Sequence, residues 1–229
     1  MSQSRARTNK PASERRAEIL DHAQRLFLQQ GYDCTSVNDL IQALGLSKGA
    51  FYHHFESKQA VLEALTDRML AGYEPTMCAL LDDPGLSALE KWQRLMSSSN
   101  QWKLEHKEAL LMQLSAMHNS ANLLLKTSLT NKSRAIGVPL FSRLLAQGVA
   151  EGCFELADPA QTAHFLFALM DAQSDQLTQY LLYPERFDDP AGASFALLCA
   201  SQQAIERLLA APVGSLPLID RDAIDAWFN

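Results

Sequence analysis

Apolar residues recur at spacings of three and four along almost the whole chain, and no segment alternates convincingly between apolar and polar positions. This periodicity is typical of amphipathic α-helices and predicts an all-α protein. The first apolar stripe predicts a helix over residues 13–30 that ends at Gly31, since glycine tolerates the backbone that closes a helix. The buried face of this helix should contain Ile19, Ala23, Leu26 and Phe27.

The same periodicity, divided by glycine and proline, predicts helices along the rest of the chain. We expect them at about 36–44, 47–54, 57–72, 86–104, 106–118, 121–150, 159–182, 190–210 and 221–227. Asp-Pro pairs that begin at Asp83, Asp158 and Asp189 predict helix starts, because an acceptor at the cap and a proline in the first turn both suit a helix N-terminus. Pro75 should kink or end the fourth helix, and Pro139 should bend the longest one.

Residues 35–58 predict two short helices joined by a tight turn, followed by the start of a third helix. Ser36 fits the N-cap of the first helix, and Asp39 completes a capping-box pattern three residues later. Gly45 ends this helix and Ser47 caps the next one. Two helices that cross at a tight turn form the helix-turn-helix motif, whose second helix lies in the major groove of DNA.

From about Arg16 to Leu65 the chain resembles the DNA-binding domain of TetR-type transcriptional repressors. The resemblance rests on the order and spacing of Ile19-Leu20, Ala23 to Phe27, Gly31-Tyr32, Thr35-Ser36-Val37, Gly45 to Phe55, and Lys58. It covers under a quarter of the chain. One departure is Asn38, where many relatives carry a basic residue, so a base contact at this position would differ.

The resemblance implies a three-helix DNA-binding domain over residues 1–58 and a larger helical domain over 59–229 that binds an effector and dimerises. The DNA-contacting positions that it implies are Ser36, Asn38, Ser47, Lys48, Gly49, Ala50, Tyr52, His53, His54 and Lys58. Among these, Tyr52, His54 and Lys58 match positions that contact the DNA backbone. For Lys58 the alternative is an ordinary solvated lysine.

The charge distribution supports a DNA-binding N-terminal region. The chain has a net charge of −6, but residues 1–58 hold eight Lys and Arg against six Asp and Glu, a net of +2. The first sixteen residues carry five basic residues and one acid. Positive charge therefore collects where phosphate attraction requires it. The alternative is that this arm is simply a solvated terminus.

Other kinds of chemistry have little support in the sequence. There is no GxSxG, HExxH or phosphate-loop motif, which argues against an enzyme. Adjacent residues on a helix point about 100° apart, so His53 and His54 would chelate one metal ion poorly, and we expect no metal or other cofactor. The four cysteines show no CxxC spacing, and neither a signal segment nor a membrane-length apolar run is present. These features favour free thiols in a cytoplasmic protein.

The large domain contains aromatic and methionine residues with a few polar groups between them, which is a pattern typical of a ligand cavity. The candidate ligand-binding residues are Trp92, Trp102, Met112, His118, Phe167 and Asp171. The alternative is strong, because aromatic and methionine residues at helical spacing usually pack in the core.

Two helices near the C-terminus carry stripes of small residues, which predicts a dimer interface. The stripe of the helix over 190–210 is formed by Ala193, Ala196, Ala200, Ala204, Arg207 and Ala211. The helix over 159–182 similarly carries Ala160, Ala163, Phe167 and Ala168. Small residues let helices approach closely, so two such helices from each chain would build a four-helix interface. Alternatively, these faces pack within one chain.

The sequence therefore predicts a homodimeric transcription regulator that binds a palindromic site in double-stranded DNA. The resemblance implies that it is a repressor released by a small-molecule effector. One alternative keeps the DNA binding but gives the large domain a protein partner. A second alternative is a helical enzyme or carrier in which the helix-turn-helix is incidental.

Overall fold

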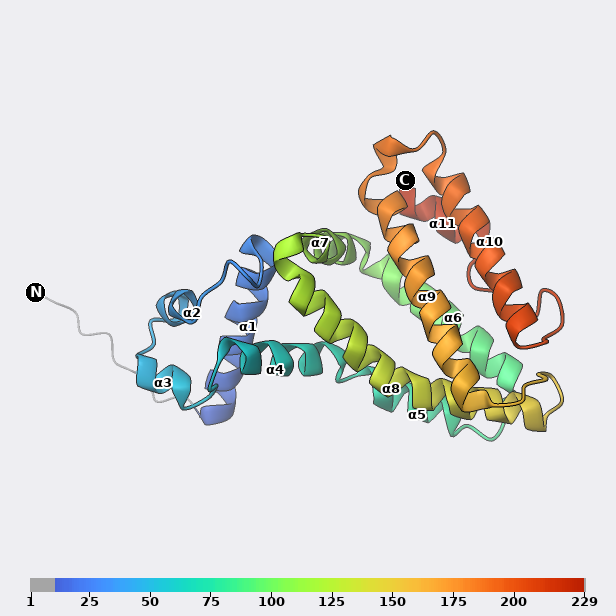
Figure 1. Ribbon diagram of the computed structural model, residues 1–229, viewed down its shortest axis with the longest axis horizontal. Coiled ribbons are helices and arrows are strands. Elements are labelled where there is room, and N and C mark those ends of the chain that lie inside the picture. The colour runs from blue at the N-terminus through green and yellow to red at the C-terminus, as the bar shows by residue number, and fades with distance from the viewer. Residues whose placement is uncertain (1–10, 229) are drawn as a thin grey trace, which may run out of the picture. The chain divides into compact units, whose positions relative to one another are not determined.

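The computed structural model describes residues 11–228, and all regular structure in this range is helical (Figure 1). The α-helices are α1 (Ala12–Gln30), α2 (Val37–Leu44), α3 (Lys48–Tyr52), α4 (Lys58–Leu70), α5 (Tyr73–Leu81), α6 (Ala88–Glu105), α7 (Lys107–Met117), α8 (Leu123–Ala150), α9 (Pro159–Leu182), α10 (Pro190–Leu208) and α11 (Arg221–Phe228). Two short 3₁₀ helices, η1 (Ser120–Asn122) and η2 (Pro184–Arg186), precede α8 and α10. The predicted all-α fold class is confirmed.

The chain forms two compact units, each built from two stretches of sequence. The first unit contains the described residues up to Met69 together with Ala116–Leu129. The second contains Leu70–Ser115 together with the chain from Thr130 onwards. We expected a division after residue 58, whereas α4 belongs to the first unit because its apolar face completes the core of that unit.

Helices α1 to α4 of the first unit enclose a core of fully buried apolar side chains. Phe27 of α1 and Phe51 of α3 are its largest members, and Val61 and Leu65 of α4 close it. Burial of each such side chain contributes about 1.5–3 kcal/mol. The short α3 is therefore held in place by Phe51, and its remaining side chains are left available to face outwards.

The segment from Ala116 to Leu129 completes the first unit although it follows the helix-turn-helix by about sixty residues. Asn122 is only 1% exposed, and its Oδ1 accepts from the Tyr32 N–H at 2.7 Å. Its amide nitrogen donates to the carbonyl oxygens of Phe27 at 2.8 Å and Ala116 at 3.0 Å. Gly31, with φ +93°, lies beside this segment so closely that an added Cβ would come within 2.5 Å of the Ala121 Cβ.

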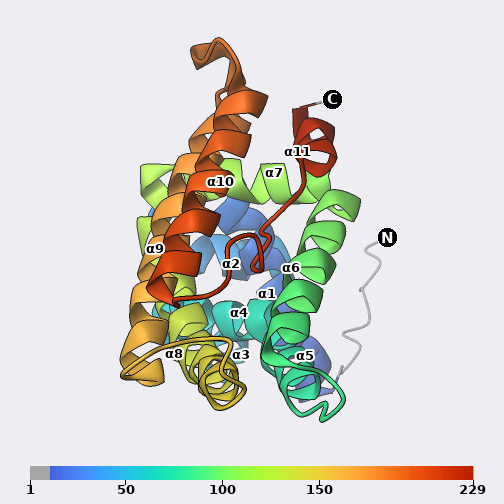
Figure 2. The same ribbon diagram turned by 90° about the vertical axis from the view of Figure 1, so that its right-hand side faces the viewer.

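The second unit has its own core, centred on aromatic rings from three helices. Trp92 of α6 meets Phe141 of α8 at 6.0 Å between ring centroids, and Phe141 meets Phe167 of α9 at 5.3 Å, both in edge-to-face geometry. Such pairs add about 0.5–1.5 kcal/mol beyond the area that they bury. Helices α9 and α10 run antiparallel beside this core (Figures 1 and 2).

The chain after α10 returns across the second unit and ends in α11, which packs between α10 and α6 (Figure 2). Polar contacts fix this C-terminal segment, residues 212–228. The Asn100 amide donates to the Leu218 carbonyl oxygen at 2.6 Å, and the Lys107 ammonium donates to the Ala226 carbonyl oxygen at 3.0 Å. The buried Glu206 carboxylate accepts from the Leu216 N–H at 3.2 Å.

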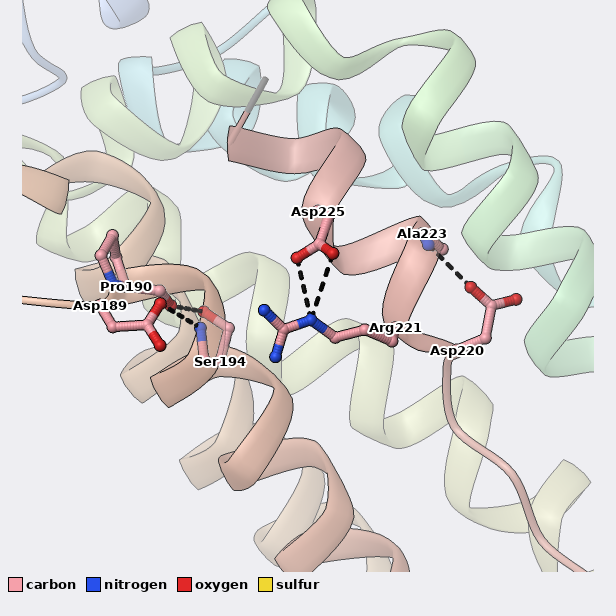
Figure 3. A network of polar contacts seen from close by, with 8 residues as sticks. Asp189, Pro190, Ser194, Asp220, Arg221, Ala223 and Asp225 are labelled. Atoms are coloured by element: carbon pink, nitrogen blue, oxygen red, sulfur yellow. Dashed lines mark hydrogen bonds and ion pairs between the residues drawn. The ribbon is translucent and has the colours of Figure 1, made fainter.

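Figure 3 shows how the ends of α10 and α11 are capped. Asp189 accepts from the Gly192 N–H at 2.8 Å at the start of α10, and Asp220 accepts from the Ala223 N–H at 2.7 Å at the start of α11. Arg221 pairs with Asp225 one turn later at 3.0 Å. Each side-chain cap of this kind contributes about 1 kcal/mol.

Most predicted helices agree with the structure to within two or three residues, and α9 begins and ends as expected. The fourth helix ends before Pro75, as expected, but one further helix was not predicted, and the prediction for Asp83 was wrong. Pro75 lies in the first turn of an additional helix, α5, which suits proline because the missing N–H has no helical partner there. Asp83 does not cap a helix: its carboxylate accepts from the Gly85 N–H in a turn, and Ser87 caps α6 instead.

Candidate DNA-binding surface and ligand cavity

The helix-turn-helix has the local geometry that its sequence predicts. The Ser36 side chain accepts from the Asp39 N–H at 3.1 Å, and Asp39 accepts from the Ser36 N–H at 2.7 Å, which completes the capping box. The Ser36 N–H, and the Ser36 hydroxyl that also donates to the Asp39 carboxylate at 2.7 Å, hold the pKa of Asp39 below its usual value. Gly45 closes α2 in the left-handed conformation at φ +61°, and the Ser47 side chain caps α3 by accepting from the Ala50 N–H.

Helix α3 and the two histidines that directly follow it present an outward surface that combines a lysine, small residues, a tyrosine and the two imidazoles. Lys48, Gly49 and His53 are exposed, and Tyr52 is 49% exposed even though it is aromatic. Of the other predicted DNA contacts, Ser36, Asn38 and Ser47 are exposed, whereas Ala50, His54 and Lys58 are partly buried. Lys48, Gly49 and Tyr52 are thus accessible on α3, and His53 is accessible directly after it.

Gly49 has no packing role inside the protein. An added Cβ at this position would meet no other atom within 4 Å, and its backbone is helical, so neither crowding nor a left-handed conformation requires glycine. A residue without a side chain on the outward face of α3 lets a partner approach the backbone closely. This is the property expected of a position that faces a DNA groove.

Lys58 makes contacts within the protein that the sequence did not indicate. Its ammonium donates to the Tyr32 carbonyl oxygen at 2.8 Å and lies 4.1 Å from the centroid of the Tyr32 ring. Lys58 is therefore not a fully solvated lysine. An ammonium has three donors, so the contact with Tyr32 leaves donors that can bind a phosphate. In this structure Lys58 fixes the turn that follows α1.

Positive charge gathers where α1 begins and α3 ends. The pKa of His54 lies below its ordinary value, mainly because of burial and then because of the nearby charges of His53, Arg15 and Arg16. The Arg16 guanidinium stacks 4.7 Å from the centroid of the Phe55 ring, which holds this charge near α3. The remaining basic residues of the predicted arm, Arg5, Arg7 and Lys10, lie outside the described residues.

The two adjacent histidines have their ring centroids 5.2 Å apart at an interplanar angle of 74°. Among the described residues, no group of three or more His, Cys, Asp or Glu side chains is arranged to hold a metal ion. The four cysteines are free thiols, and only Cys34 is exposed.

The second unit contains a cavity of about 220 Å³ between α6, α7, α9, α10 and the C-terminal segment. Its walls are mainly leucine, isoleucine and methionine side chains, together with Trp227. The polar residues that line it are Asn100, Lys103, Gln173, Ser174 and Thr178. A more open groove of about 490 Å³ along α6 shares Met96, Asn100, Leu218 and Ile219 with this cavity.

None of the six ligand-binding candidates lines the cavity or the groove. Trp92 and Phe167 are buried in the core, as the alternative interpretation held. Trp102 is 52% exposed and stacks on His106, and Met112 is 75% exposed. Asp171 forms an ion pair with Arg134, and His118 is partly buried in the first unit.

The contribution of the C-terminal segment to this cavity was not predicted from the sequence. Leu218, Ile219, Ile224 and Trp227 form part of its wall. A signal was present, because α11 combines apolar positions at helical spacing with a capping aspartate at Asp220. The pattern predicts the short helix, but it does not say which part of the protein the helix covers.

Comparison with known proteins identifies relatives of the first unit. Residues 19–65 match the model of the family described as bacterial regulatory proteins, tetR family. A helix-turn-helix transcriptional repressor of Mycobacterium tuberculosis is 49% identical over 61 residues, which cover 25% of this chain and 33% of the repressor. The repressor KstR2 of Rhodococcus jostii is 43% identical over 61 residues, covering 27% of this chain and 28% of the relative. The match spans about a third of the length of these curated relatives.

Longer similarities extend over both units. The regulator YfiR of Bacillus subtilis is 26% identical over 187 residues, covering 77% of this chain and 84% of the relative. The solved structure of SmeT, the repressor of the Stenotrophomonas maltophilia multidrug efflux pump SmeDEF, matches with a TM-score of 0.61 and 21% identity. This match covers 90% of this chain and 96% of SmeT, and a complex of SmeT with triclosan matches with a TM-score of 0.63. The structural matches share the helical fold of the chain.

Proposed function

Because this chain is a helix-turn-helix transcriptional regulator of the TetR family, we propose that it is a repressor that a small-molecule effector releases from a palindromic DNA operator. The family consists of transcription regulators and not of enzymes. The observation that carries the proposal is the presence of an outward-facing α3 in one unit and an apolar cavity in the other. A protein that binds chromosomal DNA would act in the cytoplasm.

Helix α3 is the proposed recognition helix. Lys48 donates to base edges, for which guanine O6 and N7 are the best acceptors, and Gly49 allows close approach of the backbone. Tyr52 and His54 contact phosphates, and so does Lys58 with the donors that Tyr32 leaves free. Asn38 places an amide on α2 at a position where many relatives carry a basic residue. An amide and a basic residue favour different bases, so the operator should differ from the operators of those relatives.

Two-fold symmetry of the operator requires a dimer, and α10 offers the face for it. Ala196 and Ala200 are exposed, whereas Leu198 and Ile205 on the other side of the helix are buried in the protein's own core. On the neighbouring α9, Phe165 is 65% exposed and adds apolar surface that a second chain would cover. Two recognition helices on a dimer would reach successive major grooves about 34–36 Å apart.

Part of the interface that we expected on α9 belongs instead to the interior of the protein. Ala163 is fully buried and Phe167 is 7% exposed, because both face the aromatic core of the second unit. Ala160 and Ala168 remain exposed. The proposed interface on α9 therefore runs along Ala160, Phe165 and Ala168 rather than along the four residues predicted from the sequence.

The cavity supports a small molecule as the effector rather than a protein partner. A filled bundle would have favoured a protein partner, whereas an apolar hollow with a few polar groups is typical of a ligand site. The similarity to SmeT, which has been solved with triclosan, supports the same proposal. A coupling of about 1–3 kcal/mol between effector and DNA would change the affinity for the operator five- to 150-fold.

The test of DNA binding is selection of bound sequences from random duplexes, followed by fluorescence anisotropy with the selected site. We expect a palindromic site bound about a thousandfold or more tighter than random DNA at physiological salt. Lys48→Ala should change the preferred bases, whereas Lys58→Ala should weaken binding to all sequences and reduce the salt slope by about one. Equal affinity for selected and random DNA would refute the proposal.

A further inference from the structure

The cavity of the second unit contains a single charged group. Of the residues that line it, only Lys103 carries a charge, and no Asp, Glu, Arg or His side chain is among them. The rest of the wall is dominated by leucine, isoleucine and methionine. Such a wall by itself favours a neutral apolar molecule, so the ammonium decides which class of ligand the cavity selects.

Lys103 has no partner of its own in the described part of the chain, where no hydrogen bond or ion pair reaches its ammonium. Its side chain keeps a large accessible surface, and yet burial lowers its pKa. The accessible surface and the lowered pKa are compatible when a side chain has protein around it and its tip faces a cavity. An ammonium that faces this cavity without a counter-ion would be stabilised by a bound anion.

The other polar groups of the cavity are mostly engaged. The Asn100 amide donates to the Leu218 carbonyl oxygen, and the Thr178 hydroxyl donates to the Ser174 carbonyl oxygen at 2.7 Å. Gln173 differs, because its buried Oε1 has no hydrogen-bond partner. The two ends of an amide are assigned from their surroundings, and the side chain can turn to present N–H instead of oxygen. Lys103 thus provides an uncommitted donor for a carboxylate, and Gln173 provides a second one when its amide is turned.

We propose that the cavity selects an amphipathic monoanion, an apolar molecule with one carboxylate that pairs with Lys103 while the Gln173 amide binds its second oxygen. The proposal rests on the proposed function, because it names the class of effector for the same regulator. Flexible leucine and methionine side chains adapt to the shape of the apolar body, so the charge discriminates more sharply than the shape does. A neutral alcohol can accept a hydrogen bond from the ammonium but brings no counter-charge, and an amine adds a like charge beside it.

The test uses the full chain and three probes that differ only in the head group: decanoate, decanol and decylamine. Binding is measured by isothermal titration below the micellar concentration of each probe, and folding is checked by circular dichroism. The variants are Lys103→Met, which keeps the length of the side chain without its charge, and Lys103→Arg, which keeps the charge. Arg94→Met is the control, because Arg94 is an exposed cation on the same helix that does not line the cavity.

We expect decanoate to bind about ten- to a hundredfold more tightly than decanol, and decylamine to bind most weakly. Lys103→Met should remove the preference for decanoate, Lys103→Arg should keep most of it, and Arg94→Met should leave it unchanged. Gln173→Leu should reduce it less than Lys103→Met does. Equal binding of decanoate and decanol, or a preference that survives Lys103→Met, would overturn the proposal.

The DNA-binding function is measured in parallel with the selected operator. If none of the probes binds while specific operator binding persists, the inferred ligand class is wrong, but the proposal that the protein is a DNA-binding regulator still holds. If operator binding is absent as well, the proposed function also fails. If decanol binds as well as decanoate and releases the operator, the effector site stands but its selectivity for anions does not.

Discussion

The replacement Asn122→Ala tests whether the segment from Ala116 to Leu129 is a structural part of the DNA-binding unit. Asn122 makes three hydrogen bonds from a side chain that is only 1% exposed. Of its three partners, the carbonyl oxygens of Phe27 and Ala116 keep other donors, the N–H groups of Gly31 and Asn119. The Tyr32 N–H is therefore the partner that the replacement leaves without an acceptor, and it should account for most of the lost stability.

The magnitude follows from these contacts. An unsatisfied buried N–H costs about 1–3 kcal/mol, and each of the other two hydrogen bonds contributes about 0.5–1.5 kcal/mol net. Because both carbonyl oxygens keep a donor, we expect Asn122→Ala to lower the free energy of unfolding by about 2–4 kcal/mol. The turn at Gly31 and Tyr32 should loosen with it, and so should the Lys58 contact to the Tyr32 carbonyl oxygen.

The assay is urea unfolding followed by circular dichroism, together with hydrogen exchange at the Tyr32 N–H. Asn119→Ala is the matched control: Asn119 lies three residues earlier and is exposed, and its side chain accepts from the Ala121 N–H at 3.0 Å. The control should cost about 1 kcal/mol or less. If both variants unfold at the same urea concentration and the Tyr32 N–H exchanges as slowly as before, the segment does not hold the DNA-binding unit together.

Three further predictions concern the interface, the DNA contacts and the C-terminal segment. Ala200→Glu combined with Ala204→Glu should give a folded monomer with at least tenfold weaker operator binding, and an unchanged dimer in sedimentation would place the interface elsewhere. The His54 pKa lies below its ordinary value in the free protein and should rise beside phosphate. Operator affinity should therefore increase as the pH falls below about 6.5, and His54→Gln should remove this increase in anisotropy titrations. Glu206→Ala should lower the free energy of unfolding by about 1–3 kcal/mol, because it leaves the Leu216 N–H and the Gln202 amide without their acceptor. Burial alone would raise the pKa of Glu206, but these hydrogen bonds outweigh it and lower the pKa, so the wild-type advantage should be present above pH ~4.3 and vanish in acid.

The helix-turn-helix could be predicted almost completely from the sequence because its determinants are local. The caps at Ser36 and Ser47, the left-handed glycine at Gly45 and the buried Phe51 each act within a few residues of their own position. Local hydrogen bonding and backbone preferences are visible in a sequence without knowledge of the tertiary fold. The same holds for the caps of α9 and α10 at Asp158 and Asp189.

The ligand cavity could not be predicted in the same way because its determinants are distant in sequence. Helical periodicity indicates that Trp92 and Leu177 lie on apolar faces, but the same pattern describes a side chain in a filled core and one that lines a hollow. Trp92 belongs to the first kind and Leu177 to the second. The distinction depends on which helices meet, and the contribution of α11 is decided by its packing against α6 and α10.

The role of Asn122 shows the same limit for a polar residue. In sequence it is one asparagine near the start of the helix expected over 121–150, whereas in the structure it binds backbone atoms of Phe27 and Tyr32, at least ninety residues away. The chain thereby completes its DNA-binding unit with residues that directly follow α7, whose earlier part belongs to the unit with the cavity. Any ligand that changes the stability of α7 or α8 therefore acts on helices that also supply the DNA-binding unit, which is the condition that coupling between an effector and an operator requires.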